Sequence, residues 1–279
     1  MRHGLFSISI LLSSAALLLA GAGCGGDDDE EELGAGQDTT TEEKPTTEKR
    51  AGARVISGSG DIASVVERYR RLLGPDNGGA PDGDPDGHRE LNWDKVPDQL
   101  AAPNDFPSGF FNAKRAPRAR GAVLETPGDG LEVSADSDNP SGAAPRFGHI
   151  NRRYSDQFKT FSPERLFSPV GSNLVDLRFN VPGTDTPAVV RGFGAVYTDV
   201  DRRENTAFEY FDSAGKSLGQ YATPVSVNGL SFLGVAFERP VVARVRIEYG
   251  SGKLGPDDSA DYDVAVMDDF IYGEPQASR

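Results

Sequence analysis

The chain has 279 residues and a formal net charge of −14, with 43 Asp and Glu residues against 29 Lys and Arg residues. Nucleic acid is recognised through basic patches that neutralise phosphates, so this charge balance argues against a nucleic-acid partner. Cys24 is the single cysteine, and the chain can therefore form neither an internal disulfide nor a cysteine-rich metal site. The folded part must be stabilised by a hydrophobic core, or by hard cations bound through oxygen ligands.

The first 24 residues have the pattern of an export signal. A short basic start precedes an apolar run over residues 5–20, and small residues at 21–23 lead directly to Cys24. The run is shorter than the ~20 residues that span a bilayer. This pattern resembles a bacterial lipoprotein signal. The resemblance implies that residues 1–23 are removed and that Cys24 becomes the lipidated first residue, which anchors the protein at the extracytoplasmic face of the cell membrane. The alternative is an ordinary secretory leader with an incidental cysteine.

Residues 24–52 are predicted to form an acidic, disordered tether. The segment is rich in acids, threonines and glycines and contains few large apolar residues. Such a sequence cannot bury enough apolar surface to offset the entropy lost on ordering. Repulsion among its acids would keep it extended and hold the folded part away from the membrane.

A helix is predicted over residues 61–73. Apolar residues recur at spacings of three and four from Ile62 to Leu73, which is helical periodicity. Asp61 can cap the start of this helix, and Gly74 before a proline can end it. The helix and the Asp-, Gly- and Pro-rich loop that follows it form a predicted segment, residues 53–88, before the main domain.

That loop contains three alternate aspartates, Asp82, Asp84 and Asp86, followed by Gly87. Alternate carboxylates before a glycine can surround one calcium ion, because the turn directs their oxygens to a common point. The segment resembles the start of a calcium-binding loop, although Trp93 stands where an EF-hand has its bidentate glutamate. We therefore consider two alternatives, a calcium site of another loop type and a solvated loop.

From residue 89 the sequence consists of short β-type runs separated by Gly, Pro, Asn and Asp. The clearest alternation lies in residues 241–249, where apolar and charged side chains take opposite faces. No helical pattern of comparable length interrupts these runs. We therefore predict an all-β fold, an antiparallel two-sheet jelly-roll sandwich over residues 89–275. The predicted strands are 121–126, 130–134, 174–181, 188–198, 206–212, 230–237, 241–249 and 263–272.

Five segments carry a family resemblance: GFGAVYTDVD from residue 192, FEYFDSAGKSLG from 208, SFLGVAF from 231, VARVRIEYG from 242 and VMDDFIYGEP from 266. Together they resemble the closing strands of secreted bacterial jelly-roll modules of the galactose-binding-like kind. The whole chain also resembles an uncharacterised group of secreted proteins that share a Glu-Leu-Asn-Trp-Asp opening. The resemblance implies the sandwich fold and several functions, because many such modules bind sugars, others are structural and a few are attached to enzymes.

The first and last strands of jelly rolls often pair, which predicts a second acidic site. Glu90, Asn92 and Asp94 near the opening strand would then approach Asp268 and Asp269 in the closing strand. The resembling modules hold a structural calcium ion near such a place, which implies that the four acids of this cluster are calcium ligands. The alternative is that Asp268 and Asp269 accept hydrogen bonds from backbone donors in adjoining turns.

Candidate ligand contacts combine acids with aromatic rings. Asp199 and Asp201 stand at a predicted strand end, where they could contact a sugar or form a salt-linked turn. Trp93 and Tyr197 could stack on sugar faces beside them. The alternative for these rings is a place in the core, with Trp93 as the anchor of the sandwich.

The sequence contains no H-E-x-x-H, no G-x-S-x-G and no phosphate-binding loop. We therefore predict a non-catalytic module that recognises a glycan or another envelope component, with calcium stabilising the scaffold. One alternative is a glycan-acting hydrolase or lyase, with two converging carboxylates in a cleft above an aromatic floor. Another is a structural or protein-binding surface protein with an open edge strand.

Overall fold

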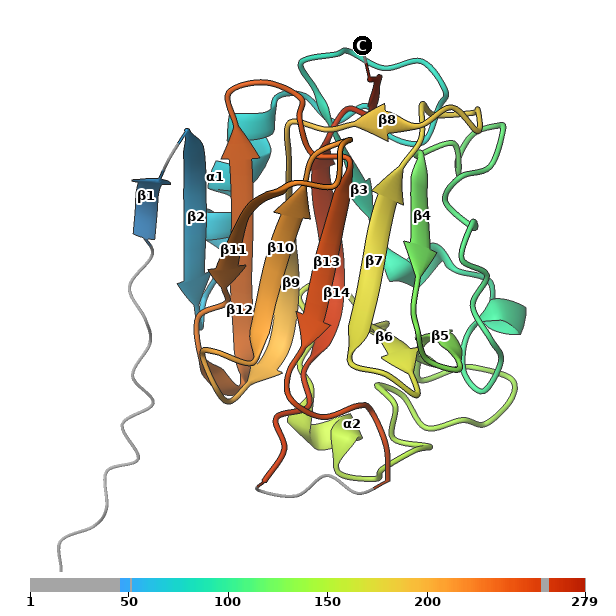
Figure 1. Ribbon diagram of the computed structural model, residues 1–279. Helices are drawn as coiled ribbons and strands as arrows, with labels where there is room; N and C mark the ends of the chain where they lie inside the picture. Colours follow the sequence, from blue (N-terminus) through green and yellow to red (C-terminus); the bar gives the residue numbers. More distant parts are fainter. Residues whose placement is uncertain (1–45, 51, 257–260, 279) are drawn as a thin grey trace, which may run out of the picture. The chain divides into compact units, whose positions relative to one another are not determined.

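In the computed structural model, the described residues are 46–50, 52–256 and 261–278. They form a sandwich of two β-sheets (Figure 1). All pairings between the named strands of these residues are antiparallel, and the chain crosses between the two sheets several times. The prediction of an all-β, two-sheet sandwich is confirmed. The predicted leader, Cys24 and the tether up to residue 45 lie outside the described residues.

The larger sheet has eight strands in the order β1-β2-β12-β9-β14-β6-β5, and β3 pairs with β14 beside this path. The longest strands, β12 and β9, are neighbours, and β9 is buried along its whole length. The strand bounds are β1 Thr46–Arg50, β2 Ala53–Ser59, β3 His88–Leu91, β5 Gly130–Val133, β6 Phe167–Val170, β9 Gly192–Val200, β12 Ser226–Phe237 and β14 Val266–Gly273.

The smaller sheet has five strands in the order β11-β10-β13-β7-β4. Its bounds are β4 Ala122–Glu125, β7 Leu174–Phe179, β10 Thr206–Phe211, β11 Ser217–Ala222 and β13 Arg244–Tyr249. Two short strands, β8 Ala188–Val189 and β15 Gln276–Ala277, form a separate pair. The helices are α1 Ala63–Leu73 and α2 Tyr154–Gln157, with 3₁₀ turns η1 Trp93–Lys95 and η2 Asp98–Leu100. None of the helices in the described ranges is long and apolar enough to cross a membrane.

Trp93 anchors the aromatic core between the sheets. Its ring is fully buried and stacks on Phe167, with ring centroids 4.3 Å apart, while Phe270 packs against it edge-on at 5.1 Å. The indole N–H donates to the backbone oxygen of Asp268 at 2.7 Å, so its polar group is satisfied inside the core. Trp93 therefore fixes the chain after β3 against the closing strand β14.

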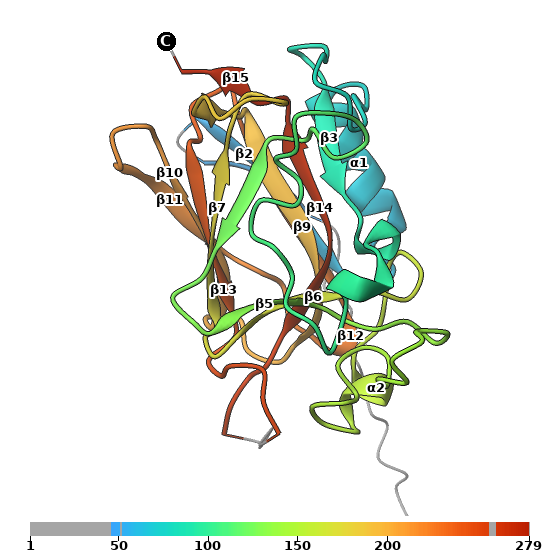
Figure 2. The ribbon, with the colours of Figure 1, turned by 90° about the vertical axis from the view of Figure 1, so that its right-hand side faces the viewer.

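Helix α1 covers the outer face of the larger sheet (Figure 2) through Tyr69. The tyrosine ring lies over Gly192, Gly194 and Gly234, and its hydroxyl donates to the Val235 oxygen at 2.9 Å. A Cβ on Gly194 would stand 2.7 Å from the Gly234 Cα, and a Cβ on Gly234 would stand 2.6 Å from the ring. These glycines therefore allow the helix to approach the sheet closely.

The predicted helix and all eight predicted strands are present, with bounds that agree within a few residues. The predicted strand 188–198 is divided into β8 and β9, and the sandwich begins before residue 89. Strand β2 pairs with β12 over Ala53–Ser59, and α1 covers the same sheet, so the predicted separate segment 53–88 belongs to the sandwich. Residues 46–50, at the end of the predicted tether, pair with β2 as strand β1.

Candidate functional site

Strand β3, which begins the predicted domain, pairs with β14 as expected, but β1 and β2 precede it, so β3 is not the first strand of the sandwich. Arg89 in β3 is fully buried and makes two hydrogen bonds, at 2.7 and 2.8 Å, with the Glu274 carboxylate after β14. The same guanidinium also donates to three backbone oxygens, those of Gly78, Ala80 and Ala119. Because both charges are paired and the guanidinium has further acceptors, this buried ion pair holds the two strand ends together.

A β-bulge in β14 brings two adjacent carboxylates together. The register of β14 against β9 shifts between Met267 and Phe270, which both pack in the core. The carboxylates of the intervening residues, Asp268 and Asp269, both reach the Ser162 hydroxyl, at 2.9 and 3.0 Å. A regular strand would send consecutive side chains to opposite faces. The bulge is therefore what allows the two carboxylates to share one partner.

Backbone and side-chain donors occupy the oxygens of this pair. Asp268 accepts from the backbone N–H groups of Phe161 and Ser162 at 2.6 and 3.2 Å. Asp269 accepts from the Asn92 side chain at 3.2 Å and lies 3.9 Å from the Arg70 guanidinium of α1. Asn92, directly after β3, therefore meets the closing strand, and Glu90 shares the Arg70 guanidinium with Asp269. Asp94 instead accepts from the Arg165 backbone, so neither Glu90 nor Asp94 contacts Asp268 as predicted. For Asp268, backbone donors in the adjoining loop are also present, which was the alternative to calcium ligation.

Burial raises the pKa of both carboxyl groups. Asp268 is fully buried, and the neighbouring charge of Asp269 adds to the rise in its pKa. For Asp269, burial and the charge of Glu90 outweigh the hydrogen bond from Ser162 and the attraction of Arg70, and raise the pKa to about 6. The two carboxyl groups titrate as a pair, in which a shared proton avoids burying two negative charges side by side.

In contrast to these two aspartates, Glu90 has a lowered pKa and stays ionised. Arg70 donates to its two oxygens at 2.7 and 2.9 Å, and the His88 ring lies 3.0 Å from one of them. Burial would raise the pKa of Glu90, but these contacts lower it to about 2. Burial would also lower the pKa of His88, and its bonds to Glu90 and the Gly74 oxygen raise it instead. Glu90 is therefore a permanent hydrogen-bond acceptor rather than a proton donor.

A hollow of about 670 Å³ lies beside this network. One wall comes from β3 and the 3₁₀ turns η1 and η2, and the other from residues 110–120 before β4. The lining combines charged groups with proline, leucine and phenylalanine surface. Its residues are Asp76, Glu90, Asn92, Asp94, Lys95, Pro97, Leu100, Phe110, Phe111, Pro117, Arg118 and Arg120. Three predicted site positions, Glu90, Asn92 and Asp94, therefore share one concave surface.

The predicted ring contacts need correction. Trp93 and Tyr197 are both fully buried, so neither ring presents a face to a ligand in this structure. Asp199 is also buried, where it accepts from the Asn228 backbone at 2.6 Å and from the Gln157 side chain. It joins strand β12 to helix α2 instead of facing a ligand. Asp201 is exposed at the end of β9. The sequence could not distinguish these positions, because aromatic and acidic residues occur both in cores and at sites.

The loop aspartates do not converge on a common point. Asp82, Asp84 and Asp86 are exposed, and Asp84 accepts from the Asp86 backbone at 2.9 Å. Asn77 organises this loop by bonding to the backbone of Asp84 in both directions, at 2.9 and 3.0 Å. An Asx-type turn therefore shapes the segment that was predicted to surround calcium.

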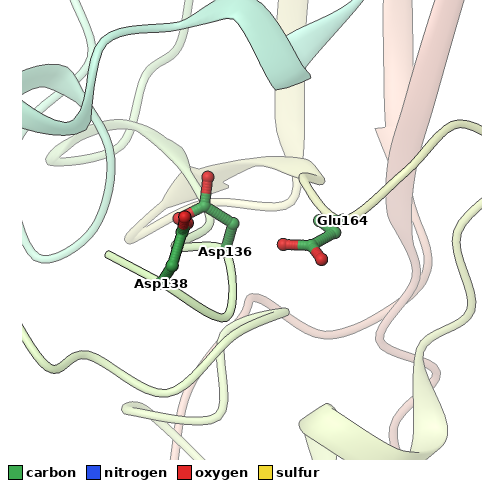
Figure 3. A group of neighbouring side chains, drawn as sticks. All are labelled: Asp136, Asp138 and Glu164. Atoms are coloured by element: carbon green, nitrogen blue, oxygen red, sulfur yellow. The ribbon is translucent and has the colours of Figure 1, made fainter. Parts of the chain in front are cut away.

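A different group of acids has carboxylate oxygens that lie close to one another. Among the described residues, the three acids whose oxygens lie within 4.8 Å of one another are Asp136, Asp138 and Glu164 (Figure 3). Asp136 is paired with the Arg165 guanidinium at 2.8 Å, and Glu164 accepts from the backbone and hydroxyl of Ser137. Sequence analysis missed this group, because Asp136 and Asp138 are only two alternate acids and Glu164 comes from a separate loop.

The fold and this site define an antiparallel β-sandwich with a polar hollow beside strand β3. Comparison with known proteins adds no relative. No family model matches the chain, and neither a curated protein nor a solved structure does.

Proposed function

We propose that the protein is a non-catalytic glycan-binding module, anchored through Cys24 at the extracytoplasmic face of the cell membrane. The observation that carries this proposal is the hollow between β3 and residues 110–120. It presents carboxylate, amide and guanidinium groups beside the apolar surfaces of Pro97 and Leu100. Sugars have both hydroxyl groups and apolar ring faces, and a site for them needs both kinds of surface in one concave region.

The titration behaviour of the acids supports binding over hydrolysis. A glycoside hydrolase needs a protonated carboxyl group and a second carboxylate on either side of the substrate bond. Asp268 and Asp269 have raised pKa values, but they are 0% and 3% exposed and do not line the hollow. Glu90 lines the hollow, but its pKa of about 2 leaves it without a proton at neutral pH. Neither Glu90 nor the buried aspartate pair therefore supplies the protonated carboxyl group that hydrolysis would need in the hollow.

A glycan array tests the binding function. The purified protein is compared with Pro97→Trp, which places a large side chain over the hollow from an exposed position. Pro127→Trp, at an exposed turn outside the lining, is the matched control, and thermal unfolding checks that both variants fold. We expect glycan binding by the wild type and Pro127→Trp, and its loss in Pro97→Trp. An array without binding, or equal binding by both variants, would refute a glycan site in the hollow.

The proposed anchor is tested separately. Cells grown with labelled palmitate should incorporate the label into the wild-type protein, and Cys24→Ser should abolish incorporation and release the protein from the membrane fraction. If the wild type is exported without label, the leader is an ordinary secretory signal.

A further inference from the structure

The charges that line the hollow are not equally available to a ligand. Glu90 is already paired with Arg70 and His88, so its negative charge is largely compensated within the fold. Two other acids remain: Asp94 accepts from the Arg165 backbone at 3.0 Å, and Asp76 accepts from the Gly78 backbone at 2.8 Å. A backbone N–H supplies a hydrogen bond without a full positive charge. Asp76 and Asp94 therefore keep acceptor capacity for hydroxyl groups.

Two positively charged side chains of the hollow, Lys95 and Arg118, have fewer partners within the fold than its acids. In the described part of the chain, the side chains of Lys95 and Arg118 form no ion pair, and both are exposed in the hollow. The guanidinium of Arg118 lies 4.6 Å from the centroid of the Phe110 ring. This cation–π contact orients the guanidinium while its N–H groups stay available. Arg120, in contrast, donates to the backbone oxygens of Glu90 and Pro117 and mainly shapes the wall.

From these contacts we infer that the preferred glycan is acidic and contains uronate units; this inference rests on the proposed function. The planar guanidinium of Arg118 matches the two oxygens of a sugar carboxylate, and Lys95 adds a second positive charge. The hydroxyls of the same sugar can donate to Asp76 and Asp94. A neutral glycan would leave both cations without an anionic partner.

The negative net charge of the protein helps to distinguish specific binding of an acidic sugar from non-specific attraction. With a formal charge of −14, the protein as a whole repels acidic polymers. Binding of an acidic sugar would therefore report local contacts in the hollow, because non-specific attraction between protein and polymer acts in the opposite direction.

The experiment is calorimetric titration of the purified protein with two probes, trigalacturonate and the neutral sugar maltotriose. We expect trigalacturonate to bind about tenfold more tightly, and Arg118→Ala and Lys95→Ala each to weaken it about tenfold with little change for maltotriose. The matched controls are Arg115→Ala and Lys114→Ala, because both residues are exposed and lie outside the lining. They should leave both affinities unchanged.

The contrary outcomes separate this inference from the proposed function. Equal affinity for the two probes, or neutral glycans alone on the array, would overturn the uronate preference and leave the glycan-binding function standing. An equal loss of trigalacturonate binding in the Arg115 and Lys114 controls would also overturn it, since the effect would then be general charge. If neither probe binds and the array is blank, both the uronate preference and the glycan-binding function are wrong.

Discussion

Replacing Asp269 by asparagine should stabilise the protein at neutral pH. Burial is the largest cause that raises the pKa of this carboxyl from its ordinary value of 3.8 to about 6. The folded protein therefore holds a proton that the unfolded chain releases more easily. The stability of the fold then decreases as pH rises from about 4 to about 6, and the loss is complete above that range.

The size of the effect follows from the same pKa difference. Because the pKa of Asp269 is about two units higher in the folded protein than in the unfolded chain, ionising this carboxyl group destabilises the fold by about 3 kcal/mol. Asparagine resembles the protonated carboxyl group in shape and avoids this loss, but its amide must still share Ser162 and Asn92 as partners. We therefore expect the Asp269→Asn variant to be about 1–3 kcal/mol more stable than the wild type at about pH 7.5.

Urea unfolding across pH measures this difference. The free energies of unfolding of the variant and the wild type should nearly coincide at about pH 4 and diverge up to about pH 7. Asp138→Asn is the matched control, since Asp138 is exposed, and it should change stability by less than about 0.5 kcal/mol. If Asp269→Asn is instead less stable than the wild type at every pH, the Asp269 carboxylate is ionised in the folded protein and stabilised by Arg70, which contradicts the raised pKa.

Three further perturbations test other parts of the structure. Arg89→Met should cost about 3–5 kcal/mol in chemical unfolding, because it leaves the buried Glu274 carboxylate uncompensated; a cost under about 1 kcal/mol would contradict this role. Gly194→Ala should lower stability by about 1–3 kcal/mol through overlap with the Gly234 backbone, whereas Gly109→Ala, with open space around it, should not; equal melting temperatures for the two would refute the close packing. Calcium tests the predicted structural ion: at about 2 mM it should raise the melting temperature by several degrees relative to chelator, because an ion that binds only the folded state stabilises it. An unchanged melting temperature would contradict the predicted calcium site.

The predicted elements of the fold are those whose side chains repeat regularly. Residues 241–249 alternate, and residues 61–73 have helical spacing, so strand β13 and helix α1 were predicted from pattern alone. Strand β3 reads HREL, with three polar residues in four, and carries no apolar alternation. Its Arg89 is buried because Glu274 pairs with it from the other end of the domain. A partner that distant is not visible in local sequence.

The candidate site was predictable only in part, because several of its contacts also join residues that are distant in sequence. The sequence analysis placed Glu90 and Asn92 beside the closing strand by taking their segment as the first strand, and β3 does pair with β14 although β1 and β2 precede it. The bulge at Asp268 and the donors from Ser162 did not, because they depend on register and on a loop distant in sequence. Arg118 was missed because it is one of many charged residues, and only the fold places it in the hollow.

The pairing of β3 with β14 also determines when the protein can fold. Strand β2 must find β12, and β3 must find β14, and each partner lies near the opposite end of the chain. Sandwiches with such long-range pairing fold in milliseconds to seconds, because long loops must close before the contacts form. The larger sheet can therefore be completed only after Val266–Gly273 has been synthesised. A chain that ends before this strand would leave β3 unpaired and β9 with an open edge, and it should aggregate instead of folding.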